Sequence, residues 1–398
     1  MPQLNNYHQF DGLNWETGPV RNALDYQGIK APHTGKSLSE ALLFGISGGV
    51  IAGYFTFEYK GFDPWLHFLT RNTLDPMPTL RDRLGISAQV KQTDNPEKGL
   101  KNLTDALDAG KPALVWADMF SLPYNNLKGG DENGAMFPVL VYGYDGETVH
   151  IADRAKVPLT VDADVFAKAR ARTRSNKHRM MTLDVPNLDK LPGAVEAGIR
   201  TTTAYMLDEP PLKPMKGKFG LDAFQRWADL LGSSKKDGWA KAYPGAKLYS
   251  ILLTGYRYIN LWGSGGNGSR DQYADFLDEA AVILSKQSLK QVAALYRQSA
   301  TLWGELNTAL LPDNIPTFKE TRDLMQRQYD LFIAKGGDSL AERADISKRL
   351  DAIQTAIKQD FPLNEAETAA LRENLRARVL TLGEAERTAV TALREAIG

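Results

Sequence analysis

Histidine is the side chain best suited to acid–base chemistry and metal binding near neutral pH, and the chain has five. They are scattered along the sequence, with no pair three or four residues apart and no adjacent group of ligands. This spacing argues against a metal site, and we expect none. Only His33, in the loop sequence APHTGK, is retained as a candidate for proton transfer.

Cysteine is absent from the 398 residues. Disulfides, cysteine-ligated zinc, iron–sulfur clusters and a thiolate nucleophile are therefore all excluded. The glycine-rich stretch GISGGVIAG has neither the lysine–serine pair of a phosphate-binding loop nor the strand–turn–helix order of a dinucleotide-binding motif. We expect these glycines to allow close backbone packing, and we expect no cofactor.

Charged residues near the ends of predicted elements form a second set of candidates. Glu16 and Glu40 lie near the starts of the first two predicted helices, where the helix dipole also stabilises carboxylates that have no catalytic role. Asp153 and Arg154 end a predicted strand, where a catalytic pair and a structural ion pair are both open interpretations. Arg270 follows the sequence WGSGGNGS at a predicted helix start. It indicates either phosphate or carboxylate binding, or a flexible turn with a surface ion pair.

The elements that position these residues begin as helices and continue as strands. Apolar spacing predicts helices at about 18–28 and 37–45. A strand or hairpin is predicted from residue 50, because aromatic and β-branched residues dominate VIAGYFTFEYKG. Asp145-Gly146, between two apolar runs, predicts a tight hairpin. The first part of the chain is therefore expected to contain a mostly antiparallel sheet.

Beyond residue 219 almost every segment has helical spacing. Capping boxes predict helix starts at Ser269, Asn364 and Thr381. A segment rich in proline and lysine is typical of a linker. We therefore expect an α+β domain at 1–207, a linker at 208–218, an all-α domain at 219–312 and a helical C-terminal extension at 315–398.

Composition excludes some classes of partner. Lysine plus arginine equals aspartate plus glutamate at 48 each, so the chain has no overall basic field to attract nucleic acid or an anionic membrane. The longest apolar stretch, ALLFGISGGVIAGYFTF, is broken by glycines and is shorter than the roughly 20 residues of a membrane-spanning helix. The N-terminal sequence MPQLNNYHQF has no signal-peptide pattern, so we expect a cytoplasmic protein.

Several motifs, taken in order, resemble the N-terminal domain of the butirosin biosynthesis protein H family: NWETGPVRNALDYQG, SLSEALLFGISGGVIAGYFTFEYKG, TRNT, LPY and VLVYGYDGETVHIADRA. GSGGNGSRDQYADFLDEAA resembles the uncharacterised domain that usually follows it. The resemblance covers about residues 10–312. It implies a papain-like α+β fold at 1–207, and transfer of an acyl group from a carrier-protein thioester, through a cysteine, to an amine.

In such a fold the cysteine begins the first long helix, a histidine on a later strand is its base, and an asparagine or aspartate orients the histidine. Asn14 and Trp15 stand where the family has a histidine–cysteine pair before ETG. Met136 or Phe137 falls where the base is expected. Only Asp153 matches its expected role, so the resemblance implies that nucleophile and base are both lost.

Two hypotheses follow. The first, which we favour at this stage, is an enzyme of specialised metabolism that promotes acyl transfer, condensation or cyclisation of an acyl or amine intermediate without a cysteine. The second is a non-catalytic pseudoenzyme that acts as a scaffold or binding partner. The expected catalytic residues are Glu16, His33 and Asp153, and the expected substrate contacts are Trp15, Thr17, Glu40, Arg71, Tyr124, Phe137, Arg154, Arg270 and Tyr273.

The expected partner is a small-molecule substrate, which an acyl carrier protein could deliver, and a homo-oligomer is left open. Polar groups that are costly to bury are expected around the family motifs, and they favour the enzyme hypothesis. These groups are Glu16, Glu40, Arg71, Asp153 and Arg154. Full pairing of these groups with one another around a closed core would undermine it.

Overall fold

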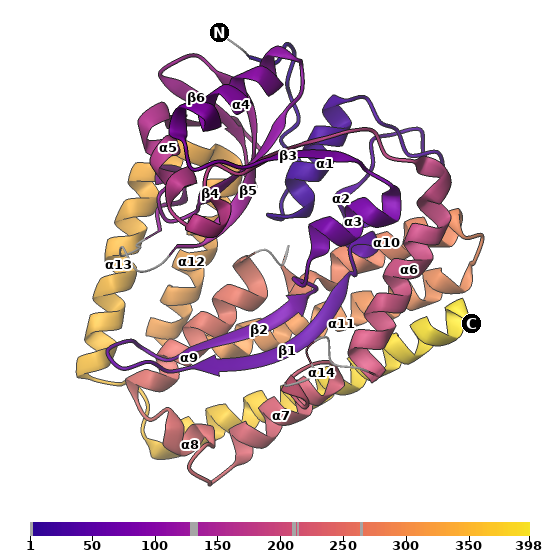
Figure 1. Ribbon diagram of the computed structural model, residues 1–398. Coiled ribbons are helices and arrows are strands. Elements are labelled where there is room, and N and C mark those ends of the chain that lie inside the picture. Colours follow the sequence, from indigo (N-terminus) through magenta and orange to yellow (C-terminus); the bar gives the residue numbers. More distant parts are fainter. Residues whose placement is uncertain (1–2, 128–133, 209–211, 213–214, 263–265) are drawn as a thin grey trace. The chain divides into compact units, whose positions relative to one another are not determined.

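The computed structural model describes residues 3–127, 134–208, 212, 215–262 and 266–398 (Figure 1). The chain divides into two compact units, each assembled from three segments. The first unit contains Met1–Leu43, Leu80–Leu191 and Gln328–Asp345, and the second contains Phe44–Thr79, Pro192–Arg327 and Ile346–Gly398. The predicted sequence domains at 1–207, 219–312 and 315–398 stay a prediction.

The first unit is built on a six-stranded sheet in the order β3-β8-β4-β5-β6-β7, in which all neighbours are antiparallel. Helices α1, α4 and α5 pack against it (Figure 1). The strands are β3 (Ala88–Lys91), β4 (Ala113–Asp118), β5 (Met136–Tyr144), β6 (Thr148–Ala152), β7 (Leu159–Asp162) and β8 (Met180–Leu183). The helices are α1 (Thr17–Tyr26), α4 (Pro96–Asp108) and α5 (Ala163–Ala171), together with the start of α2 (Glu40–Ile46) and the end of α3 (Pro76–Leu84). The antiparallel α+β prediction is confirmed.

Local chemistry explains the turns of this unit. Asp145 Oδ1 accepts hydrogen bonds from the amides of Glu147 at 3.0 Å and Thr148 at 2.7 Å, and Gly146 has a φ of +101°. The predicted hairpin therefore joins β5 to β6. α1 is followed by Gly28 at a φ of +77°, a conformation that favours glycine, so the predicted end of this helix is also confirmed.

A segment late in the chain completes the first unit. Residues 328–345 comprise the end of α12 (Pro316–Lys335), the 3₁₀ turn Gly336–Ser339 and the start of α13 (Leu340–Gln359). The Lys156 amide donates to the Ile333 carbonyl at 2.8 Å. A Cβ at Gly336 would lie 2.6 Å from Leu159, so this turn packs tightly against β7. Part of the C-terminal extension therefore belongs to the core of the first unit.

The second unit is mainly helical and includes one antiparallel pair, β1 (Val50–Phe57) with β2 (Trp65–Arg71). This pair, which we call the β1–β2 ribbon, packs on α7 and α9 (Figure 1). Its strands confirm the prediction made for VIAGYFTFEYKG. The remaining helices are α6 (Leu191–Thr203), α7 (Leu221–Gly232), α8 (Trp239–Ala242), α9 (Ala246–Tyr256), α10 (Arg270–Ile283), α11 (Ser288–Leu310) and α14 (Glu365–Ile397).

Aromatic residues fill the core of the second unit. Phe68 on β2 lies 5.3 Å from both Trp227 and Trp303, and the two tryptophans are completely buried. The glycine-rich stretch allows the close approach predicted for it, because a Cβ at Gly45 or Gly49 would overlap the rings of α10. Burial of these large rings contributes to the stability of the unit.

Two of the three predicted helix starts are confirmed. Asn364 and Glu367 form the expected capping box at the start of α14, with both bonds at 2.9 Å. Ser269 is the N-cap residue of α10, as predicted, but it has a φ of +65° and its side chain makes no capping bond. The start predicted at Thr381 is wrong, because Thr381 lies inside α14 and its hydroxyl donates to the Ala377 carbonyl. Packing of an apolar helix face overrides the local motif there.

The predicted linker at 208–218 lies partly outside the described residues, which omit 209–211 and 213–214. Within the described ranges, no helix combines the length and the apolar character needed to cross a membrane.

Candidate functional site

The start of α1 is held in place by a carboxylate from α2. Glu40 accepts hydrogen bonds from the Leu13 amide and the Asn14 amide at 2.8 Å each, and from the Thr17 hydroxyl at 2.9 Å. Burial raises the pKa of Glu40, and these hydrogen bonds oppose the rise. Glu40 and Thr17 therefore fix the turn that carries Trp15, which is a positioning role.

Trp15 and Phe137 form a stacked aromatic pair at the centre of the site. Their ring centroids are 4.7 Å apart with an interplanar angle of 29°. Trp15 comes from the residues just before α1, Phe137 lies on β5, and only 6% of Trp15 is exposed. The positions at which the resemblance places nucleophile and base therefore touch through two aromatic rings.

Arg154 connects this stack to Asp153. Its guanidinium carbon lies 4.6 Å from the Trp15 ring centroid, a cation–π contact. Its Nε and Nη2 donate to the two carboxylate oxygens of Asp153 at 3.0 Å each, and Nη2 also donates to Asn125. The Tyr124 hydroxyl donates to Asp153 at 3.1 Å. Asp153 is 3% exposed, so its carboxylate is buried and fully engaged.

The backbone at Arg154 has a φ of +35°, which is unfavourable for a residue with a Cβ. The Ala155 amide closes a tight turn onto the Asp153 carbonyl. Burial alone would lower the pKa of Arg154, but the negative charge of Asp153 raises it above its ordinary value. The ion pair thus maintains both the charge and the strained turn.

Residues from the C-terminal segment close the other side of the site. The Arg154 guanidinium carbon lies 5.0 Å from the Phe332 ring centroid, and that of Arg343 lies 5.2 Å from the same ring. Arg343 also donates to the Tyr124 carbonyl at 2.6 Å. We call the set Trp15, Phe137, Asp153, Arg154, Tyr124 and Phe332 the aromatic–arginine cluster.

The chemistry available to the aromatic–arginine cluster is limited. Burial, and then the charge of Asp153, raise the pKa of Tyr124, so its phenol stays protonated at neutral pH. The Asp153 carboxylate accepts three hydrogen bonds from Arg154 and Tyr124. Neither group is ready to take a proton from a substrate.

The remaining candidates of the first unit lie around this cluster. Glu16 is the residue that precedes α1, and it is half-buried and makes no side-chain capping bond. His33 is half-buried in the turn at 31–35. Their predicted roles in proton transfer stay predictions.

Three predicted substrate contacts belong to the second unit. Arg71 ends β2 and is 8% exposed. Tyr273 is completely buried on α10, with its ring centroid 4.8 Å from that of Tyr296. It is therefore a core residue, and close packing against Gly49 explains its position.

Arg270 has neither of the environments expected for it, because it is completely buried in an internal ion pair. Its Nε and Nη2 donate to Glu386 of α14 at 2.7 and 3.0 Å. Its remaining N–H groups donate to the carbonyls of Ile51, Thr70 and Gly268. The prediction of an anion site at this arginine is corrected: the acid comes from within the unit. Residues 263–265 of the glycine-rich loop lie outside the described residues.

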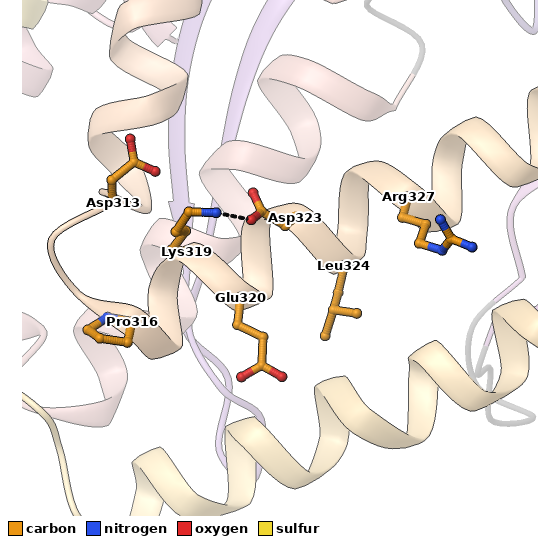
Figure 2. Close-up of a pocket in the computed structure, with 7 residues that line it drawn as sticks. All are labelled: Asp313, Pro316, Lys319, Glu320, Asp323, Leu324 and Arg327. Carbon is orange, nitrogen blue, oxygen red and sulfur yellow. Dashed lines mark hydrogen bonds and ion pairs between the residues drawn. The ribbon is translucent and has the colours of Figure 1, made fainter.

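A hollow of about 440 Å³ lies on the second unit along the first half of α12 (Figure 2). Figure 2 shows Lys319 paired with Asp323, while Glu320 is held by Arg349 at 2.6 Å. None of the predicted site residues lines it. No group of three acidic or histidine side chains suited to a metal occurs among the residues that the structure describes.

Asn125, Phe332 and Arg343 were missed by sequence reasoning. Asn125 directly follows the LPY motif and could have been found from it. Phe332 and Arg343 lie beyond the family resemblance, in helices whose pattern indicates only amphipathic packing. Arg343 contacts Tyr124 across a sequence separation of 219 residues, and no local motif can indicate such a contact.

Comparison with known families divides the chain into two matched segments. Residues 14–154 match the model described as butirosin biosynthesis protein H, N-terminal. Residues 164–323 match a domain of unknown function (DUF4872). None of the curated proteins compared with the chain matches it. The first match begins one residue before Trp15 and ends at Arg154, so it encloses the central pair of the cluster.

Proposed function

We propose that the chain is a non-catalytic member of the butirosin biosynthesis protein H family, whose N-terminal model matches residues 14–154 and is followed by the domain of unknown function at residues 164–323. Its ancestral acyl-transfer site is replaced by the aromatic–arginine cluster. The observation that carries the proposal is the stack of Trp15 on Phe137 at 4.7 Å, beneath the guanidinium of Arg154.

Positions 15, 137 and 153 lie close together in the structure, which supports a papain-like arrangement. The resemblance alone assigned the nucleophile to Trp15, the base to Met136 or Phe137, and the orienting residue to Asp153. In the structure Trp15 contacts Phe137, and Arg154 joins Trp15 to Asp153. Positions 15, 137 and 153 are far apart in sequence, so their convergence fits a shared ancestral site.

The geometry argues against catalysis in the observed state. Covalent acyl transfer needs a nucleophile and a base within hydrogen-bonding reach of each other, and two stacked aromatic side chains occupy those places. The orienting carboxylate is held by Arg154 through two bonds, so it cannot orient a base. Asp153 and Arg154 are paired with each other, and Glu40 is occupied by two backbone amides and the Thr17 hydroxyl, which counts against the enzyme hypothesis.

A cysteine-free enzyme remains as a second candidate because of one observation, the φ of +35° at Arg154. Strained residues concentrate at functional sites, where the surrounding structure maintains them. Under this candidate, an acyl or amine intermediate delivered by a carrier protein displaces Trp15, and Arg154 holds its oxyanion.

The test restores the lost pair. Trp15→Cys/Phe137→His places a thiol before α1 and a histidine on β5, while Trp116→Cys places a thiol on β4 in the same unit as a control. With an acyl N-acetylcysteamine thioester, we expect the double variant to gain the mass of the acyl group. The wild type and the control should gain none. Turnover by the wild type that is lost in Asp153→Asn would establish the second candidate instead.

A further inference from the structure

One face of the β1–β2 ribbon carries a row of half-buried aromatic side chains. Phe57 lies opposite Trp65 and Phe55 opposite His67 in the strand register. The rings of Phe57 and Trp65 stack with centroids 5.1 Å apart. Side chains that alternate along a strand point to the same side, so these rings form a continuous surface. Aromatic surfaces that remain partly exposed commonly mark binding sites.

A π-helical turn extends this surface. α9 passes directly into the π-helix Arg257–Leu261, closed by the Trp262 amide donating to the Arg257 carbonyl at 2.9 Å. Tyr258 from this turn stacks on His67 at 4.2 Å, and Trp262 meets Tyr258 edge-on at 5.0 Å. A π-turn inserts one extra residue and redirects the side chains around it, which is why such turns concentrate at functional sites.

Arg257 lies beside Trp262, at the π-turn end of this surface. Its guanidinium carbon lies 5.1 Å from the Trp262 ring centroid, and Nη2 contacts the sulfur of Met325 at 3.9 Å. No carboxylate lies within ion-pair distance of it in the described part of the chain. Burial lowers the pKa of Arg257, and tyrosines rather than acids oppose that effect. A partly buried guanidinium with no acid partner is complementary to an anionic ligand.

Lys218 places a second positive charge on the same surface. Its ammonium nitrogen lies 5.7 Å from the Phe55 ring centroid, and no acid pairs with it among the residues described. The acids nearest the tip of the ribbon are already used, because Glu58 pairs with Lys247 and Asp63 with Lys358. The charges of Lys218 and Arg257 therefore leave this surface with positive charge that no acid neutralises among the residues described.

We propose that the ribbon face, Tyr258, Trp262 and Arg257 form a binding site for an aromatic carboxylate. The ligand ring stacks on the aromatic row, and its carboxylate pairs with Arg257, with Lys218 as a second cation on the surface. Burial, and then the charge of Arg71, lower the pKa of His67 to about 4, so its imidazole is neutral at pH 7 and serves as a stacking partner. This site belongs wholly to the second unit and is independent of the function proposed for the aromatic–arginine cluster.

The test compares an acid with its neutral match. Isothermal titration of the full chain with 1-naphthoate should give saturable binding, and 1-naphthylmethanol should bind at least about tenfold more weakly, as expected for loss of a charge-assisted contact. Arg257→Gln should weaken naphthoate binding by about tenfold or more and leave the alcohol unchanged. Arg297→Gln removes a surface arginine paired with Asp275 and Asp278 in the same unit, and it should change neither.

Lys218→Gln and Tyr258→Leu keep the test decisive if Arg257→Gln fails to fold. Each should weaken naphthoate binding, Tyr258→Leu for both ligands and Lys218→Gln for the acid alone. The proposal is overturned by absence of saturable naphthoate binding to the wild type, by equal affinity for the alcohol, or by unchanged affinity in folded Arg257→Gln.

Discussion

Among the residues that the structure describes, each compact unit contains a buried arginine–carboxylate pair, and these two pairs differ in their surroundings. Arg270 and Glu386 are completely buried, and every nitrogen of Arg270 reaches an oxygen acceptor. In the pair of Arg154 and Asp153, the arginine side chain is 13% exposed and faces two aromatic rings. The first pair therefore lies in a closed core, while the second lies in the aromatic–arginine cluster that we propose has replaced an ancestral site.

The two pairs also differ in what satisfies the arginine. Glu386 accepts bonds from the Ser299 hydroxyl at 2.6 Å and the Trp303 indole at 2.9 Å, so its network is closed by oxygen and nitrogen partners. The positive φ beside this pair lies at Ser269, whereas in the first unit it lies at Arg154 itself. The charge of Arg270 is satisfied by oxygens, and that of Arg154 partly by aromatic rings.

The largest expected effect follows removal of the acid from the closed network. Glu386→Gln leaves the charge of Arg270 buried without compensation, so we expect a loss of about 3–5 kcal/mol in the free energy of unfolding. Urea denaturation measures it, with the nearby exposed Glu384→Gln of α14 as the control. A loss below about 1 kcal/mol would show that this pair does not fasten the core.

Replacing the acid of the first unit's pair by its amide should lower the free energy of unfolding by less. We expect Asp153→Asn to lower the free energy of unfolding by about 1.5–3 kcal/mol, because Arg154 keeps its bond to Asn125 and its contacts with two rings. Asp108→Asn, at the exposed end of α4, is the matched control in urea denaturation. Equal costs for Asp153→Asn and Glu386→Gln would remove the distinction between the two pairs.

At acidic pH, the difference in unfolding free energy between wild type and Glu386→Gln should become smaller. Burial alone would raise the pKa of Glu386, but Arg270 and the hydrogen bonds from Ser299 and Trp303 hold it below the ordinary value of 4.5. Because the folded-state pKa is lowered, this stabilisation is present above pH 4.5 and is lost as pH falls through the lower folded-state value. Urea midpoints of both proteins from pH 7 to 3 measure this, and a constant difference would contradict it.

The smallest expected effect is the direct coupling between Trp15 and Arg154. A double-mutant cycle with Trp15→Leu and Arg154→Met should give a coupling of about 0.5–2 kcal/mol in unfolding free energy, the range for a partly desolvated cation–π contact. Trp116 on β4 and Arg179, the residue before β8, offer a reference cycle, because the Arg179 guanidinium carbon lies 4.3 Å from the Trp116 ring centroid. Zero coupling at Trp15 would mean that the ring merely fills space.

Local patterns predicted the local structure. The Asp145-Gly146 hairpin, the extent of α1 and the strand at Val50–Phe57 follow from turn chemistry and residue spacing, which act within a few residues. The family motifs also placed Trp15 and Asp153 in one site. Phe137 was one of two candidates for the third position, and the structure shows that its ring contacts Trp15.

Partners distant in sequence could not be predicted. The glycine-rich sequence before Arg270 indicated an anion-binding site as one interpretation. The acid that pairs with this arginine lies 116 residues later, on α14. Likewise, Phe332 reaches Arg154 from a segment beyond the family resemblance. A sequence window reports propensity and capping, whereas these contacts depend on how helices pack after the chain has folded.

Thiol release by the wild-type protein tests the central claim most directly. The chain has no cysteine, so a thiol reagent added with acyl N-acetylcysteamine thioesters and an amine acceptor reports only the thiol that leaves the substrate. We predict release at the rate of the protein-free reaction for every thioester and acceptor. Release above that rate, abolished by Trp15→Ala and Asp153→Asn, would contradict the account and show that the aromatic–arginine cluster is an active site.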